Sequence, residues 1–417
     1  MKSIRFVCFI ACLSTASSVA AETSDSTIVR LLRNEGITFS HDNNVKLLTT
    51  GQEKFDDMFS AIRQARSSVH LEYFNFRNDS IAMELFHILA EKAREGVEIR
   101  ALYDDFGNMS NNRPLKRHHL DSLRALGINI HAFMPIKFPW IHCYFHRDHR
   151  KIVVIDGKIA YTGGMNVADY YIKGTEVVGE WHDMHCRIEG EEVNTLQRIF
   201  RRMWKKVTGE DFSGPQYYRG YTTPSYFTGK LPQGHKMVGI INREPYRSPA
   251  IMRRFYCGAI DAARDSIKLI NPYFCLIPCI SRALKRAISR GVKVELMIAA
   301  NSDIPITPDA AFLNMYRLMK RGARVFIYQG GFHHTKVIMV DGRFCTVGST
   351  NLDARSLRHD YEENAVIIDP ATTHELEQLF ERDKRRSFVL TKESWNRWRS
   401  AKDKLIGYFG KLISFLM

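Results

Sequence analysis

The chain has 417 residues, which is more than one hydrophobic core usually holds, so two domains are expected. With 45% hydrophobic and 25% charged residues, the composition is that of an ordinary globular protein and excludes a chain dominated by disorder. The formal charge of +15 favours anionic partners, either lipid headgroups or nucleic acid.

Residues 1–20 have the pattern of a secretory signal peptide. A basic start precedes an apolar run from Phe6 to Leu13, and a small-x-small cleavage pattern ends at Ala21. Because this run is well short of the ~20 residues that span a bilayer, a transmembrane anchor is the weaker alternative. The sequence predicts an exported protein; an uncleaved anchor or a lipoprotein-like N-terminus at Cys8 or Cys12 stays open.

Residues 21–210 are expected to form a first α/β half. Helical patterns at 55–68 and 80–96 alternate with apolar strands at 69–74 and 97–105. Strands that alternate with helices predict a parallel-rich sheet with helices on its faces.

A motif of chemically active residues follows from His149 to Asn166, HRKIVVIDGKIAYTGGMN. Apolar runs around an Asp-Gly dipeptide predict a strand, a tight turn and a second strand. His149 and Lys151 stand at i and i+2, so their side chains point to the same face of the first strand. An imidazole and an ammonium group can then meet one phosphate from one side.

The first half ends with a predicted strand at 181–190 and an amphipathic helix at 193–207. Leu196, Phe200 and Trp204 share one face of that helix, which favours core packing over ligand binding. Residues 211–246 are rich in Gly, Pro, Tyr and Thr with little periodicity, and are interpreted as the linker between the halves.

Residues 247–394 repeat the plan of the first half. Two helical patterns and three strands lead into HTKVIMVDGRFCTVGSTN, from His334 to Asn351, which repeats the first motif at the same spacing and contains the small pair Gly348-Ser349. The predicted fold is therefore α/β, with two similar halves related by a pseudo-two-fold axis and an active site between them.

The duplicated residues suit chemistry on a phosphodiester. One His can attack phosphorus to give a phosphohistidine, while the other protonates the leaving alcohol, so one site needs both. The Lys and Asn residues would donate hydrogen bonds to the non-bridging oxygens. The motif Asp is expected to accept from the imidazole N–H and to fix its tautomer. This chemistry requires no metal, and His pairs such as His182 and His185 lack the Cys or carboxylate partners of a zinc site.

In these two motifs the chain resembles the phospholipase D superfamily, whose signature is HxKxxxxD followed by a GG/GSxN element. Other stretches resemble bacterial cardiolipin synthases: EYF at 72–74, GVEIRALYDDFG, W-x-D followed by RIEG, NPYF, GSTNLDARSL and Glu362. The resemblance runs from about residue 45 to the end. It implies transfer of a phosphatidyl group between phosphatidylglycerol molecules, with release of glycerol, and anionic phospholipids and the membrane surface as partners.

The resemblance also implies which residues act. The six motif residues expected to be catalytic are His149, Lys151, Asp156, His334, Lys336 and Asp341. The residues expected to bind the substrate or support these groups are Asn166, Asn351, Ser349 and Glu362. Either Glu362 or its neighbour Glu363 could hold a motif His through its second nitrogen.

The chain departs from the family pattern at three places. Typical members begin with two transmembrane helices, where this chain has the signal-like segment. Asp148 stands where the family has Asn before the first His, which adds a charge expected to raise the pKa of that imidazole. Asp360 likewise replaces an Asn, two residues before Glu362.

Two alternatives stay open on the sequence. A hydrolase that uses water as the acceptor, on phospholipid or nucleic acid, would have the same motifs; the basic runs RIFRRMWKK and RDKRR are more typical of solvated helix faces, which disfavours nucleic acid. Residues 395–417 predict an amphipathic helix with apolar positions at helical spacing and a basic stripe. Such a helix either lies in a membrane interface or packs on its own domain.

Overall fold

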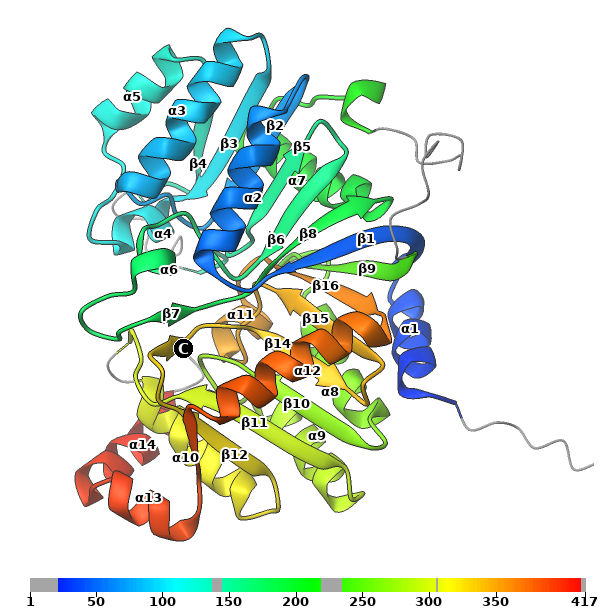
Figure 1. The fold of residues 1–417 in the computed structure, drawn as a ribbon, viewed down its shortest axis with the longest axis vertical. Helices are drawn as coiled ribbons and strands as arrows, with labels where there is room; N and C mark the ends of the chain where they lie inside the picture. The colour runs from blue at the N-terminus through cyan, green and yellow to red at the C-terminus, as the bar shows by residue number, and fades with distance from the viewer. Residues whose placement is uncertain (1–21, 137–144, 219–234, 305–306, 414–417) are drawn as a thin grey trace, which may run out of the picture.

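Two arrays of strands meet in the middle of the molecule to form one continuous sheet (Figure 1). The computed structural model describes residues 22–136, 145–218, 235–304 and 307–413, so the predicted signal peptide lies outside the described residues. The strands of the first half are β1 (Ser40–Leu48), β2 (Ser68–Tyr73), β3 (Glu98–Asp104), β4 (Asn129–Phe133), β5 (Ile152–Ile155), β6 (Ile159–Gly163) and β8 (His185–Gly190). Those of the second half are β9 (Lys236–Arg243), β10 (Ser266–Ile270), β11 (Lys293–Ala299), β12 (Arg324–Tyr328), β14 (Val337–Val340), β15 (Phe344–Gly348), β16 (Glu362–Ile368) and β17 (Ser387–Val389).

The strand order shows the predicted pseudo-two-fold symmetry. From one edge the sheet runs β4-β3-β2-β5-β6-β8-β1, and from β9 it continues β16-β15-β14-β10-β11-β12, which is the same order of equivalent strands in reverse. The axis lies between β1 and β9, which pair antiparallel. The prediction of two similar α/β halves is confirmed.

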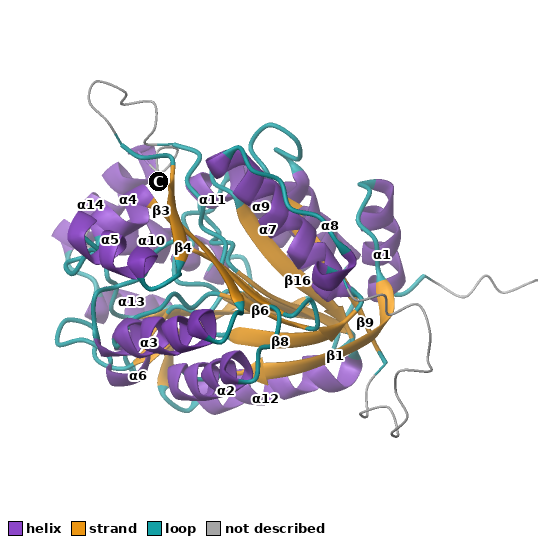
Figure 2. Ribbon diagram, turned by 90° about the horizontal axis from the view of Figure 1, so that it is seen from above, coloured by secondary structure: helices purple, strands orange, loops and turns teal. Residues whose placement is uncertain are grey.

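The sheet is mixed rather than parallel-rich. Among the described strands of this sheet, parallel pairing is limited to β2-β3-β4 and β10-β11-β12, where helices provide the crossover connections. Each motif adds an antiparallel hairpin, and the strands between the hairpins and the middle of the sheet are antiparallel as well. Helices cover both sides of the strands (Figure 2).

The helices follow the predicted periodicity closely. The main ones are α1 (Ser24–Asn34), α2 (Gly51–Arg63), α3 (Ser80–Arg94), α7 (Glu192–Thr208), α8 (Ile251–Ala262), α9 (Pro278–Ser289), α10 (Thr307–Met319) and α12 (Pro370–Lys384). Helix α2 begins four residues before the predicted start because the Thr50 hydroxyl caps it, accepting from the Glu53 amide at 3.1 Å. In α7, Leu196, Phe200 and Trp204 are fully buried, which confirms their predicted core packing.

Part of the segment 211–246, which was predicted to be a linker, is a central strand. Strand β9 pairs with β1 on one side and with β16 on the other. Its sequence, KMVGIINR, has apolar residues on both faces, so it lacks the alternation that identifies a half-exposed strand. As the counterpart of β1, residues 236–243 belong to the second half.

The two halves are joined by a shared hydrophobic core. Ile152 and Val154 of β5 belong to the same buried cluster as Val337 and Met339 of β14. This apolar contact fixes the two motif hairpins relative to each other, as a site built between the halves requires.

The predicted C-terminal helix 395–417 is two shorter helices, α13 (Lys392–Trp398) and α14 (Ala401–Ile413). The break falls at Arg399, whose backbone is extended, with φ −113° and ψ 120°. Trp395 stacks on Tyr316 at 4.7 Å between ring centroids, so α13 packs on its own domain. Among the helices in the described ranges, none is both long enough and apolar enough to cross a membrane.

Candidate active site

The Asp-Gly dipeptides form the tight turns that the sequence predicts. Asp156 and Gly157 have φ of 53° and 62°, and Asp341 and Gly342 have 53° and 63°. Positive φ at both central residues is the requirement of the type I′ hairpin turn, and Gly adopts it without strain. Each motif is therefore a strand, a turn and a second strand, as predicted.

The motif aspartates hold these turns and do not contact the imidazoles. Asp156 Oδ1 accepts from the Ser67 amide at 2.7 Å, from the Ser67 hydroxyl at 2.8 Å and from the Ser68 amide at 3.0 Å. Asp341 Oδ1 accepts in the same way from the amides of residues 265 and 266, each at 2.8 Å. Burial opposes ionisation, but these backbone donors outweigh it and lower the pKa of Asp156.

The prediction that the motif aspartates fix the imidazole tautomer is therefore wrong. The physical reason is distance along the strand: at ~3.3 Å per residue, Asp156 lies roughly 20 Å from His149, at the opposite end of β5. The spacing conserved between the two copies reflects the length of the hairpin, not a direct contact.

Each imidazole is held by a carboxylate of the opposite half. His149 Nδ1 lies 3.1 Å from Glu362 Oε1, and His334 Nδ1 lies 2.6 Å from Asp183 Oδ2. The backbone also connects the two halves here, since the His149 amide donates to the Tyr361 carbonyl at 3.0 Å. The prediction that Glu362 or its neighbour holds a motif His is confirmed for Glu362.

Asp183, the acidic residue of the W-x-D stretch, holds His334, and the residue pattern did not predict this role. It is the structural counterpart of Glu362: the Gly164 amide donates to the Met184 carbonyl at 2.8 Å, and the Ser349 amide donates to the Glu363 carbonyl at 2.9 Å. When the two halves of the sequence are aligned, an acidic residue stands at the same position in each, just before β8 and at the start of β16. This shared position indicates that the two carboxylates have the same role.

The motif lysines lie on the same side as the histidines, as predicted. Lys336 Nζ is 2.8 Å from Nδ1 and 3.0 Å from Nε2 of His334. Burial lowers the pKa of Lys336 to about 8, with the nearby Lys151 adding to this and Asp183 opposing it. Lys151 Nζ donates to the carbonyl of His149 and is also buried.

The two motifs share one electrostatic environment. Burial lowers the pKa of His149 well below its usual value, and Lys151, Lys336 and His334 add to this effect. Burial and Lys336 likewise lower the pKa of His334, while Asp183 opposes them. Burial raises the pKa of Glu362 to about 7, although Lys151 counteracts it. Burial thus favours the neutral form needed of a nucleophile, in which Nδ1–H donates to the carboxylate and Nε2 keeps its lone pair, while the imidazole that acts as the acid has to carry a second proton, which its carboxylate partner stabilises.

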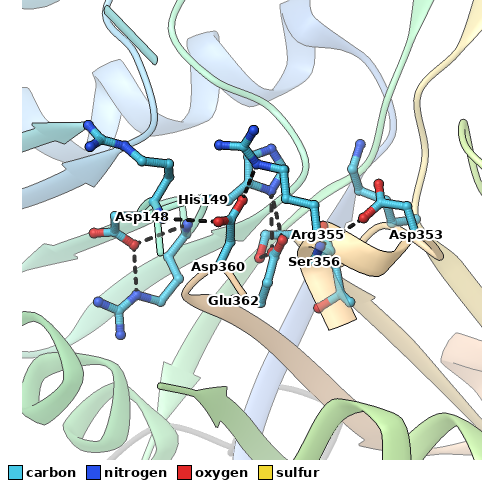
Figure 3. A network of polar contacts seen from close by, with 12 residues as sticks. Asp148, His149, Asp353, Arg355, Ser356, Asp360 and Glu362 are labelled. Atoms are coloured by element: carbon cyan, nitrogen blue, oxygen red, sulfur yellow. Dashed lines mark hydrogen bonds and ion pairs between the residues drawn. The ribbon is translucent and has the colours of Figure 1, made fainter. Parts of the chain in front are cut away.

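A network of buried charges surrounds His149 (Figure 3). The Arg147 amide donates to Asp360 Oδ1 at 3.0 Å, and Arg355 Nε donates to Asp360 Oδ2 at 2.7 Å. Asp148 was expected to raise the pKa of His149, but its Oδ1 accepts from Arg150 Nε at 3.0 Å and the pKa of His149 is lowered by burial. Asp360 is the carboxylate that opposes this lowering.

The remaining predicted residues lie at the same edge of the sheet. Asn166 and Asn351 each follow the second strand of a hairpin, where the chain returns to the level of the histidines. Their side-chain oxygens have no hydrogen-bond partner among the described residues, so a role in substrate binding stays a prediction. Ser349 is fully buried and its hydroxyl donates to Glu362, and its role in substrate binding also stays a prediction.

An imidazole that donates Nδ1–H to a carboxylate can use Nε2 to attack phosphorus or to move a proton. The structure brings together two such imidazoles, two ammonium groups and two carboxylates, with each half completing the site of the other. Two duplicated α/β halves around one site of this composition define the phospholipase D-like class.

Comparison with known proteins narrows this class. The profile of the family described as "Cardiolipin synthase, PLD-like domain" matches residues 58–204 and 256–384. Cardiolipin synthase 2 of Staphylococcus epidermidis is 34% identical over 389 residues, which cover 93% of this chain and 76% of that protein. Cardiolipin synthase of Oceanobacillus iheyensis is 33% identical over 366 residues, which cover 88% of this chain and 74% of that protein. The chain belongs to the cardiolipin synthase family.

Solved structures show the same fold at lower identity. The phosphatidylserine synthase of Haemophilus influenzae superposes with a TM-score of 0.69 at 15% identity, covering 94% of this chain and all of that one. The polyphosphate kinase of Porphyromonas gingivalis gives a TM-score of 0.56 at 14% identity, over 84% of this chain and 49% of that chain. At such identities the likeness concerns the fold alone.

Proposed function

We propose that the protein is a cardiolipin synthase, which transfers a phosphatidyl group from one phosphatidylglycerol molecule to another and releases glycerol. The observation that carries this proposal is the single site in which His149 and His334 are each held by a carboxylate of the opposite half. Membership of the family and the names of the relatives support the substrate class.

In the first step, Nε2 of one imidazole attacks the phosphorus of phosphatidylglycerol. A P–N bond forms and the bond from phosphorus to the glycerol oxygen breaks, while the second imidazole, protonated at Nε2, donates its proton to that oxygen. Glycerol leaves, and the products on the protein are a phosphohistidine and a neutral second imidazole. The carboxylates of Glu362 and Asp183 keep Nδ1 protonated throughout.

In the second step, the neutral imidazole takes a proton from a hydroxyl of another phosphatidylglycerol, whose oxygen attacks the phosphohistidine. The P–N bond breaks and cardiolipin forms. One phosphodiester replaces another, so the transfer is nearly isoenergetic and requires no nucleotide and no cofactor. We assign Lys151, Lys336, Asn166 and Asn351 to the non-bridging oxygens, where negative charge develops.

We also infer that the protein is exported and acts at the membrane of the cell envelope. The signal-like pattern of residues 1–20 and the excess of positive charge support this inference. The mature protein should begin near Ala21, which N-terminal sequencing of protein from an envelope fraction can test. Intact residues 1–20 on the envelope protein would favour the uncleaved anchor.

Lipid mass spectrometry of a defined reaction tests the activity. The purified protein, given phosphatidylglycerol in micelles with EDTA present, is expected to make cardiolipin and glycerol, with phosphatidic acid as a minor product. Predominant phosphatidic acid, or cleavage of DNA without action on lipid, would instead establish a hydrolase.

Replacement of single histidines tests the shared site. His149→Ala and His334→Ala are each expected to abolish turnover, because the mechanism needs a nucleophile and an acid at once. If each variant kept about half of the activity, the halves would be independent sites.

A further inference from the structure

Helix α14 exposes three large apolar side chains. Leu405, Tyr408 and Phe409 are 57%, 54% and 62% exposed. The buried positions of this helix among residues 401–410 are Gly407 and Gly410. A surface helix usually does the opposite and buries its apolar stripe against the core.

Gly407 accounts for the face of α14 that packs on α10. A Cβ atom at Gly407 would lie 2.7 Å from the carbonyl oxygen of Asp309 in α10, so only glycine allows this close approach of the two helices. Arg399, just before α14, forms an ion pair with the Asp309 side chain. The orientation of α14 on α10 is thus fixed by a backbone contact and a charge pair (Figure 1).

A cation contacts one of the exposed apolar side chains, and further exposed cations stand on or just after the same two helices. The guanidinium of Arg317, in α10, lies over the Tyr408 ring at 5.4 Å from its centroid. Lys320 and Arg321, just after α10, are exposed, and so is Lys402 in the first turn of α14. We call Leu405, Tyr408 and Phe409, together with these cations, the α14 surface.

Helix α10, on which α14 packs, begins close in the chain to a residue linked to the active site. Helix α10 follows the segment that contains Asp303, whose Oδ1 accepts from the Tyr273 hydroxyl at 2.6 Å. The Tyr273 ring in turn packs against the His334 ring, with centroids 6.1 Å apart. The contacts from His334 therefore reach Asp303 through Tyr273, and Asp303 stands four residues before the first residue of α10.

We propose that the α14 surface docks on an anionic lipid bilayer, with the helix lying in the interface and its apolar side chains inserted among the acyl chains. Exposed apolar residues, together with exposed cations on or just after α10 and α14, match an anionic bilayer, whose interior is apolar and whose headgroups are negatively charged. At ~1.5 Å per residue, 13 residues measure about 20 Å, which is too short to cross a bilayer. The proposal rests on the proposed function in one respect, which is that the lipid substrate is drawn from that bilayer.

Vesicle flotation of the full chain tests the docking independently of catalysis. The variant Leu405→Ser/Tyr408→Ser/Phe409→Ser is compared with the wild type on vesicles of phosphatidylglycerol and on vesicles of phosphatidylcholine. The matched control is Met83→Ser/Leu126→Ser, which removes apolar side chains of the first half that are 55% and 50% exposed, one in α3 and one just after the helix Arg117–Ala125. Circular dichroism and the melting temperature establish that each variant is folded.

The wild type and the control are expected to bind phosphatidylglycerol vesicles, and the triple variant to bind roughly ten- to a hundredfold more weakly. Lys320→Glu/Arg321→Glu should reduce binding to anionic vesicles and make it less sensitive to salt. Unchanged binding of a folded triple variant would overturn the proposal. So would a wild type that forms dimers lost in the triple variant, because the α14 surface would then contact a second copy of the chain.

Activity on a monomeric, short-chain phosphatidylglycerol separates this proposal from the proposed function. The triple variant is expected to keep the wild-type rate on that substrate and to lose activity on vesicles. If the wild type made no cardiolipin from either substrate, the proposed function would fail while the flotation result would still decide the docking.

Discussion

The carboxylates that control the imidazoles can be distinguished from those that hold the turns by a pair of substitutions. Asp183→Asn leaves the shape of the site nearly unchanged but replaces an acceptor 2.6 Å from His334 Nδ1 with a group that can also donate. The amide can then stabilise the imidazole tautomer with Nδ1 unprotonated and Nε2 protonated. That tautomer has no lone pair at Nε2 and cannot attack phosphorus or accept a proton.

The expected loss in kcat is about 10³- to 10⁴-fold, by analogy with the wrong-tautomer substitution in serine protease triads. This corresponds to about 4 to 5.5 kcal/mol of transition-state stabilisation at ~1.36 kcal/mol per tenfold. The free energy of unfolding of the Asp183→Asn variant should change by less than about 1 kcal/mol, since the backbone of the site keeps its hydrogen bonds.

Asp156→Ala should show the reverse pattern. It removes the acceptor of the Ser67 and Ser68 amides and of the Ser67 hydroxyl, at 2.7 to 3.0 Å. Hydrogen bonds to a charged group contribute ~1.5 to 3 kcal/mol each, but the turn is only partly buried and water replaces part of this. We expect a loss of about 3 kcal/mol in the free energy of unfolding, with kcat of the folded protein within about tenfold of the wild type.

Denaturant unfolding and cardiolipin formation, measured on the same preparations, decide between the two roles. Normalising activity to the folded fraction removes the effect of lost stability. A folded Asp183→Asn variant with more than a tenth of the wild-type kcat would refute the assignment of that carboxylate. A fully stable Asp156→Ala variant without activity would return tautomer control to the motif aspartate.

Three further outcomes follow from the contacts around the site. Asp360→Asn should lower the pKa of His149, since Asp360 raises it, and so shift the corresponding limb of the pH profile of kcat/KM to lower pH; an unmoved limb would show that Asp360 carries no charge there. Lys54→Met replaces a fully buried amino group, and burial lowers the pKa of Lys54 well below its usual value. The melting temperature should therefore rise, while kcat should fall about tenfold because the charge of Lys54 acts on Asp183. A variant that is less stable yet fully active would contradict this. Gly164→Ser should lower kcat about a hundredfold by displacing the carboxylate of Asp183. Adding Asp183→Glu should restore part of the lost kcat, and equal losses in the single and double variants would show that residues 164 and 183 are not coupled.

The sequence was sufficient for what depends on local periodicity and on the repeat. The Asp-Gly turns, the core face of α7 and the two-fold arrangement of halves follow from spacing alone. Strand β9 was missed because both of its faces are buried, which removes the alternating pattern. The partner of each imidazole is more than 140 residues away along the chain, so it depends on how the halves dock, which no local pattern records.

The role of Asp156 was wrong for a related reason. A shared motif shows that residues act together in one hairpin, but it does not show which of them touch. The analogy with serine protease triads predicted a contact between Asp156 and the His149 imidazole. The extended strand between these two residues makes that contact geometrically impossible. Position along a strand therefore has to be converted into distance before a role is assigned.

Differences between the two copies compensate each other within the site. Glu362 has the longer side chain, and the Ser349 hydroxyl donates to it beside His149. Asp183 has the shorter one, and its Oδ1 occupies space that a Cβ atom at Gly164 would enter at 2.2 Å. Since residues 164 and 349 are equivalent, as are 183 and 362, serine goes with glutamate in one copy and glycine with aspartate in the other. The small residue after each hairpin and the carboxylate that comes later in the same half, next to the following strand, thus form one positioning element, which acts on the histidine of the opposite half.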